Sequence, residues 1–347
     1  MNLRELSEKL GLSQTTVSRA LNGFPEVSER TRKRVLEAAE RYNYRPNTRA
    51  QSLATGRARA IGHVITLDTS HEMMNPIFGD FIAGAGSVYA GAGYEMILSV
   101  VRAEEELDAY QDMASRRSVD GIIVHGPRVG DPRPELLDRI RLPFVVHGRV
   151  PGYDGPYSWL DINNRRAFRR GTEFLIELGH RRIALLNGLE NLDFALRRRA
   201  GYESALDAAG IAVDTGLLGS GEMTETHGYL GLRRMLDRPD PPTAVLCASM
   251  LQAIGARRAL DDAGLRMGRD VSIVIHDDML SYLRNGDALP LFTALRSSVR
   301  KAGERCAEIL LEKIATGDQT PTRELWESEL MLGRSTARAP HLLDTER

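Results

Sequence analysis

Short apolar runs that alternate with helical patterns set the strongest limit on the fold of this chain. Each run is rich in Val, Ile and Leu on both strand faces, which is typical of parallel sheets covered by helices on both sides. Two successive sets of runs predict two doubly wound lobes. The runs are AIGHVITL, YEMILSV, VDGIIVH and PFVVHG, then RRIALLNG, TAVLCAS and DVSIVIH.

Helical patterns fill the intervals between these runs, with helices expected at 79–91, 165–178, 196–209 and 252–263. The run FTALRSS then returns the chain to the sheets, so the remainder is expected to complete both lobes. Ligands of open α/β sheets bind beyond the carboxyl ends of the strands. Two lobes that face each other would make that region a cleft.

At 347 residues the chain is long enough for two or three domains. It has no apolar run close to the roughly 20 residues that a membrane span needs, and its first residues lack the apolar core of a secretory signal. We therefore expect a cytoplasmic protein. Cys247 and Cys306 lie far apart without metal-ligand spacing, which predicts buried thiols and neither a disulfide framework nor a zinc site.

Positive charge is concentrated at the N-terminus. Residues 1–59 hold twelve Lys and Arg against six Glu, a net charge of +6, whereas the whole chain carries −1 and the remainder therefore −7. A basic segment of this kind indicates a polyanionic partner.

The first 45 residues have the pattern of three short helices around a small core. Leucines at helical spacing predict a helix over 3–10, which Gly11 can end in a left-handed conformation. Ser13 is a natural N-cap for a second helix over 14–21, and Ser28 for a third that extends to residue 42. The residues expected to form the core are Val17, Ala20, Leu21, Val35, Leu36, Ala38 and Ala39.

The polar face of the second helix carries the side chains that a helix in the DNA major groove uses. Amides and hydroxyls reach base edges and phosphates, and an arginine reaches guanine or phosphate. An ordinary helical hairpin with a solvated polar face is the alternative, which the local charge of +6 disfavours. The predicted DNA contacts are Ser13, Gln14, Thr15, Thr16, Ser18, Arg19 and Asn22.

A second candidate DNA-binding segment is YRPNTRAQSLATG. Pro46 disfavours a helix before it, Asn47 is an N-cap and Gly56 a stop, so only a marginal eight-residue helix fits between them. Leu53 is its one large apolar residue, which suits a wedge in the minor groove, although a plain interdomain linker remains open. The predicted contacts here are Asn47, Arg49, Ala50 and Leu53.

The stretches LRELSEKLGLSQTTVSRALNG, VSERTRKRVLEAAERYNYRPN and RAQSLATG together resemble the headpiece and hinge helix of the lactose-repressor (LacI/GalR) family. Downstream, LIELGHRRIALLNG, RRRAGY and GRDVSIVIHDD resemble the regulatory core of that family. The resemblance implies base-reading roles for Gln14, Thr15 and Arg19, a phosphate contact for Ser18, and entry into the minor groove for Leu53.

The same resemblance implies an all-α helix-turn-helix headpiece followed by a periplasmic-binding-protein-like core of two doubly wound parallel-sheet lobes. The implied units are a headpiece at 1–45, a hinge helix and linker at 46–59, an effector-binding core at 60–340 and a tail at 341–347. The first lobe would take about 60–160 and 291–325, and the second about 161–290 and 326–340.

Residues just beyond the strand ends are candidates for contact with a ligand. By resemblance, Arg198 and Asp277 occupy the effector-binding arginine and aspartate positions of the family. Such a pair suits a polyhydroxyl ligand, with an aromatic ring against its apolar face, whereas a surface ion pair and core packing are the alternatives. The candidate contacts are Asn75, Phe78, Arg149, Trp159, Phe194, Arg198, Ser249 and Asp277.

One position departs from the family pattern. Where many members have Asn-Asp or Ser-Asp, this chain has Ser249 and Met250, which suggests a more apolar subsite. Four stretches are similar in sequence to repressors of α-glucoside or disaccharide utilisation: NPIFGDFIAGA, VHGPR, FVVHGR and HDDMLSYLRNG.

Catalytic machinery is not visible in the sequence. The glycines of AGAGSVYAGAG fall inside a helical pattern and do not fit the dinucleotide-binding spacing, so no cofactor is expected. His276, Asp277 and Asp278 lack a second cluster with metal-ligand spacing, and no nucleophile elbow or P-loop is present.

Three functions remain: a ligand-responsive repressor, a sugar-binding transport protein and a sugar-modifying enzyme. The basic headpiece favours the first. We expect a homodimer that binds a palindromic operator in double-stranded DNA and leaves it when a mono- or disaccharide binds between the lobes. A corepressor that promotes DNA binding fits the same architecture, and a higher oligomer also remains open, although no coiled-coil repeat is seen.

Overall fold

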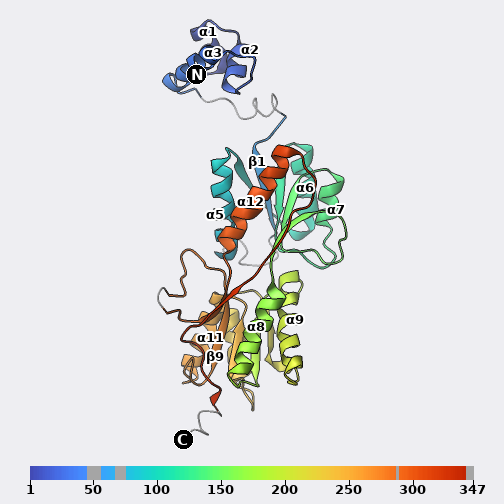
Figure 1. The fold of residues 1–347 in the computed structure, drawn as a ribbon, viewed down its shortest axis with the longest axis vertical. Coiled ribbons are helices and arrows are strands. Elements are labelled where there is room, and N and C mark those ends of the chain that lie inside the picture. Colours follow the sequence, from blue (N-terminus) through green and yellow to red (C-terminus); the bar gives the residue numbers. More distant parts are fainter. Residues whose placement is uncertain (45–55, 67–75, 287–288, 341–347) are drawn as a thin grey trace.

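The computed structural model describes residues 1–44, 56–66, 76–286 and 289–340 of the chain. It confirms a helical headpiece and a core of two α/β lobes, which follow one another along the long axis of the molecule (Figure 1). Among the described residues, no helix has the length and apolar character needed to cross a bilayer.

The three headpiece helices begin and end where the capping residues predict. Gly11 ends the first helix at a φ of 62°, a left-handed conformation that glycine adopts without strain. Ser13 Oγ accepts a hydrogen bond from the Thr16 backbone at 3.0 Å, and Ser28 caps the third helix in the same way. The helices are α1 (Leu3–Leu10), α2 (Gln14–Leu21) and α3 (Glu29–Arg41).

The headpiece core contains Leu6, Val17 and Val35, which have no exposed surface. The prediction for Leu36 was wrong, because this side chain is 49% exposed. Val35 shares its helix face with the residues three and four positions later, and Leu36 is rotated by about 100° from that face.

The first lobe has a six-stranded sheet in the order β11-β5-β4-β3-β1-β2, and every neighbouring pair is parallel. Ile122 packs toward α6 and α7, while the next residue, Ile123, packs toward α5 and α12. Both faces of the strand are therefore buried, which explains the unbroken apolar run. The elements are β1 (Ala60–Thr66), α5 (Pro76–Gly91), β2 (Glu95–Val101), η2 (Ala103–Glu105), α6 (Glu106–Ser115), β3 (Gly121–Val124), α7 (Arg133–Arg139), β4 (Phe144–His147), β5 (Ser158–Ile162), α12 (Val299–Thr316) and β11 (Arg323–Trp326).

The second lobe repeats this plan in the order β12-β10-β9-β8-β6-β7, with only the β10–β12 pair antiparallel. Leu185 packs with α8 and α9, and Leu186 with α10 and α11, so this sheet is also covered on both faces. Its elements are α8 (Asn164–Glu177), β6 (Ile183–Asn187), α9 (Asp193–Ala208), η3 (Thr215–Leu217), β7 (Leu218–Ser220), α10 (Glu225–Leu236), β8 (Ala244–Cys247), α11 (Met250–Asp262), β9 (Ser272–Asp277), β10 (Thr293–Arg296) and β12 (Glu329–Met331).

The chain crosses between the lobes after β5, after β10 and after β11. The predicted return to the first lobe at residue 291 was therefore too early, because β10 pairs with β9 in the second sheet. Trp326 likewise still belongs to the first sheet. A short buried strand looks the same in either sheet, so the sequence pattern could not assign it. The helices that were predicted to begin at residues 79, 196 and 252 begin two or three residues earlier, at Pro76, Asp193 and Met250.

Candidate functional site

A cavity of about 490 Å³ lies between the carboxyl ends of the two sheets. Thr66, His125 and His147 reach it from the ends of first-lobe strands, and His276 reaches it from β9 of the second lobe. The position is the one expected for a ligand of open parallel sheets, and the volume is in the usual range for small-molecule sites.

Arg198, in the first half of α9, is a buried cation of the cavity wall. The residue is 6% exposed, its Nε donates to Asn164 Oδ1 at 2.7 Å, and its Nη1 donates to the Ala248 carbonyl at 2.9 Å. No carboxylate of the described residues lies within ion-pair distance of it. Burial lowers its pKa to about 10, against the attraction of Asp278 and Asp161, so the guanidinium still carries its charge at neutral pH.

Two predicted aromatic residues line the same cavity. The Phe194 ring lies 4.9 Å from the Arg198 guanidinium, and the Phe78 ring meets His125 edge to face at 5.1 Å. Apolar rings beside a few polar groups are typical of small-molecule sites.

The histidines of the cavity are neutral hydrogen-bonding groups at pH 7. Burial lowers the pKa of His147 to about 4 and that of His63, behind the wall, to about 3. His63 Nδ1 lies 2.9 Å from His125 Nε2, and His63 Nε2 lies 3.1 Å from the Tyr89 hydroxyl. This buried chain fixes the orientation of the His125 ring at the cavity.

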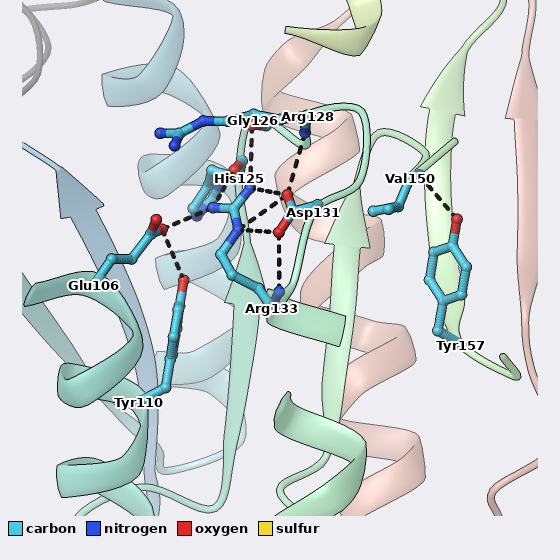
Figure 2. Close-up of polar contacts among 9 residues, drawn as sticks. All are labelled: Glu106, Tyr110, His125, Gly126, Arg128, Asp131, Arg133, Val150 and Tyr157. Atoms are coloured by element: carbon cyan, nitrogen blue, oxygen red, sulfur yellow. Dashed lines mark hydrogen bonds and ion pairs between the residues drawn. The ribbon is translucent and has the colours of Figure 1, made fainter. Parts of the chain in front are cut away.

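Arg133 holds the first-lobe end of the cavity together (Figure 2). Its guanidinium donates to Asp131, to Glu106 Oε1 at 2.8 Å and to the backbone carbonyl oxygens of His125 at 2.9 Å and Gly126 at 3.1 Å. Burial alone would raise the pKa of Asp131, but the hydrogen bonds and charge of Arg133 outweigh burial and lower it. The sequence analysis did not predict this network. The one local indication of it is that Asp131 and Arg133, which carry opposite charges, are two positions apart.

Several of the predicted effector contacts do not line the cavity. Arg149 instead pairs with Asp161 at 2.7 Å and lies over the ring of Trp159, while Ser249 is the N-cap of α11. Asp277 accepts a hydrogen bond from the Met279 backbone at 2.9 Å, and the neighbouring Asp278 lines the cavity in its place. Asn75 lies outside the described residues.

Met250 does not form the apolar subsite that the family comparison suggested. It is 5% exposed and packs in the second-lobe core, because it begins α11 with its side chain toward the sheet. Among the residues that the structure describes, no three His, Cys, Asp or Glu side chains are grouped closely enough to hold a metal ion. Cys247 and Cys306 are free and buried.

The headpiece presents one polar helix face. Gln14, Thr15 and Arg19 are exposed on α2, and their side chains make no hydrogen bond to another described residue. Thr16 Oγ1 instead lies 2.8 Å from Ser13 Oγ, and Asn22 donates to the Ser18 carbonyl at 2.9 Å, so these polar groups also brace the helix. The predicted contacts Asn47, Arg49, Ala50 and Leu53 lie outside the described residues.

A helix-turn-helix unit joined to a two-lobed core with a cavity between the lobes defines a DNA-binding transcription regulator with a ligand-binding domain. Residues 2–47 match the model of bacterial regulatory proteins of the lacI family, and residues 172–336 match the periplasmic binding protein-like domain. The chain is 44% identical to the HTH-type transcriptional regulator AglR of Rhizobium meliloti, over 98% of this chain and 95% of that protein. This protein therefore belongs to the LacI family of transcription regulators, which are not enzymes.

Two solved structures are also similar to the chain. A complex of the regulator CelR with cellobiose superposes with a TM-score of 0.71 at 30% identity, over 96% of this chain and 99% of that one. The lac repressor dimer bound to operator and an anti-inducer superposes with a TM-score of 0.83 at 26% identity, over 97% and 99%.

Proposed function

We propose that this protein is a homodimeric repressor that binds a palindromic operator in the cytoplasm and is released when a mono- or disaccharide occupies the cavity between its lobes. The burial of Arg198 without a carboxylate partner is the observation that carries the proposal. A buried cation is costly unless its remaining N–H groups find acceptors, and the hydroxyls of a sugar would supply them.

The other walls of the cavity support the same class of ligand. Phe194 and Phe78 offer apolar surface to the C–H face of a sugar ring, and Asp278 offers a carboxylate to its hydroxyls. The similar CelR structure contains cellobiose, a disaccharide. These features support a mono- or disaccharide, and the resemblance to regulators of α-glucoside use supports an α-glucoside in particular.

The proposed mechanism couples the cavity to the DNA through the relative position of the lobes. Two headpieces related by twofold symmetry would occupy successive major grooves, which requires a palindromic site. A sugar that binds the closed lobes better than the open ones would separate the segments after residue 44 in the two protomers. Such couplings typically amount to about 1–3 kcal/mol.

Operator binding by the full-length protein should weaken steeply as salt rises. Six or more phosphate contacts from two headpieces would release counterions, so the affinity should fall about 10³-fold between 50 and 200 mM salt. Fluorescence anisotropy with a labelled operator selected from random duplexes would measure this dependence. Replacing the exposed Arg19, a predicted base contact, with Gln should cost about 1–3 kcal/mol of operator affinity and relax the sequence preference, whereas Arg116→Gln, on the exposed surface of the first lobe, should leave both unchanged.

A salt-independent affinity, or equal affinity for a scrambled duplex, would contradict the proposed role of the headpiece. If a sugar instead tightens operator binding, the protein is a corepressor-dependent regulator of the same architecture.

A further inference from the structure

Glu106 is a buried residue in which only one of the two carboxylate oxygens has hydrogen-bond partners among the described residues. It begins α6, is 6% exposed and lines the first-lobe end of the cavity. Oε1 accepts from Arg133 at 2.8 Å and from the Tyr110 hydroxyl at 3.5 Å (Figure 2). Oε2 has no hydrogen-bond partner among the residues that the structure describes. A carboxylate oxygen accepts hydrogen bonds only, so this atom calls for a donor from the cavity.

The neighbours of Glu106 hold it in place and supply no such donor. Arg133 uses all five of its N–H groups on Asp131, Glu106 and the backbone oxygens of His125 and Gly126. Its side chain is 5% exposed, so it is also fixed by packing. The cation beside Glu106 therefore stabilises the carboxylate but has no donor left for a ligand.

The charges at the first-lobe end of the cavity disfavour an anionic ligand. Of the six carboxylates in the described lining, Asp161, Asp193 and Glu225 are paired with arginines outside it. At the Glu106 end, by contrast, one cation, Arg133, faces two carboxylates, Glu106 and Asp131. In a partly dehydrated site, like charges that face each other are strongly unfavourable. The carboxylates are Glu106, Asp161, Asp193, Glu222, Glu225 and Asp278.

We propose that Glu106 Oε2 accepts a hydrogen bond from a hydroxyl of a neutral sugar, and that this carboxylate excludes acidic sugars such as uronates and sugar phosphates. The inference rests on the proposed function, because it assigns the ligand class of the same cavity. Glu106 belongs to the first lobe and Arg198 to the second. A sugar that contacts both residues links the lobes and favours their closed arrangement.

Isothermal titration of the full-length protein with maltose, trehalose, cellobiose, glucuronate and glucose 6-phosphate tests this specificity. Glu106→Gln should lower the affinity for the best-binding neutral sugar by at least tenfold, which is the change expected when a hydrogen bond to a charged group is lost. The matched control is Glu104→Gln, on the exposed η2 turn two residues earlier, which should stay within twofold of wild type. Glucuronate should bind Glu106→Gln better than it binds wild type.

Monodeoxy analogues of the best sugar separate a direct contact from a packing effect. The analogue that lacks the contacting hydroxyl should bind wild type and Glu106→Gln with equal affinity, whereas the other analogues should keep the difference. This comparison is internal to each protein, so it holds even if the substitution lowers the melting temperature. Operator affinity without sugar should remain within twofold of wild type.

The outcomes distinguish the two levels of the proposal. If wild type binds none of the five compounds, the proposed function itself fails. If a neutral sugar binds Glu106→Gln and wild type equally, or if glucuronate or glucose 6-phosphate is the preferred wild-type ligand, only the role of Glu106 is overturned.

Discussion

Replacing Arg198 with leucine should abolish the response to sugar while operator binding stays within about twofold of wild type. The guanidinium is the buried donor that the proposed ligand satisfies, and each hydrogen bond to a charged group contributes about 1.5–3 kcal/mol. Two lost bonds would reduce the sugar affinity by 100-fold or more. Calorimetry with the sugar and anisotropy with the operator measure the two activities separately.

Arg199 offers a matched control on the same helix. Its guanidinium pairs with Glu190 and Glu203 and does not line the cavity. Arg199→Leu should therefore leave both activities close to wild type. Sugar affinity that survives in Arg198→Leu would remove this residue from the site, and parallel loss of operator binding would indicate a folding defect.

Arg133→Met should destabilise the core by roughly 3–5 kcal/mol, because it leaves Asp131 and Glu106 buried without their cation. Urea unfolding would measure the change. Arg116→Met removes an exposed pair with Asp112 and should cost less than about 1 kcal/mol. If Arg133→Met lowers the free energy of unfolding no more than the control does, the structural role of the network is contradicted.

The same variant should change how stability depends on pH. In the wild type, the pKa of Asp131 is lowered, so its contribution is present above the ordinary value near 4 and is lost as pH falls through the lowered pKa. Without Arg133, burial alone raises that pKa, and protonation on acidification relieves the unpaired charge. The difference in free energy of unfolding between wild type and Arg133→Met should therefore be smaller at pH 4 than at pH 7.

Features that depend on local chain chemistry could be predicted from the sequence. Gly11, Ser13 and Ser28 set helix ends through backbone conformation and capping hydrogen bonds, which involve only near neighbours. The runs around Ile122 and Leu185 read correctly as buried strands because both of their faces are covered. Phe78 was predicted near the cavity because it lies beyond the first strand, and Arg198 because of the family resemblance; both line it, as does the candidate aromatic Phe194.

Features that depend on side-chain direction or on distant partners could not be predicted. Asp277 and Asp278 are adjacent, and only the turn after β9 decides which one lines the cavity. Glu106 and Arg133 are 27 positions apart and meet because α6 and the start of α7 flank the end of β3. Nothing in the local pattern around either residue indicates that contact.

The most direct test of the account is to titrate the preformed complex of full-length protein and labelled operator with maltose, trehalose and cellobiose. The account predicts that at least one neutral sugar lowers the operator affinity tenfold or more, and that Arg198→Leu binds the operator but does not respond. A sugar that binds the protein tightly by calorimetry yet leaves the operator complex unchanged would contradict the proposed link between the cavity and DNA.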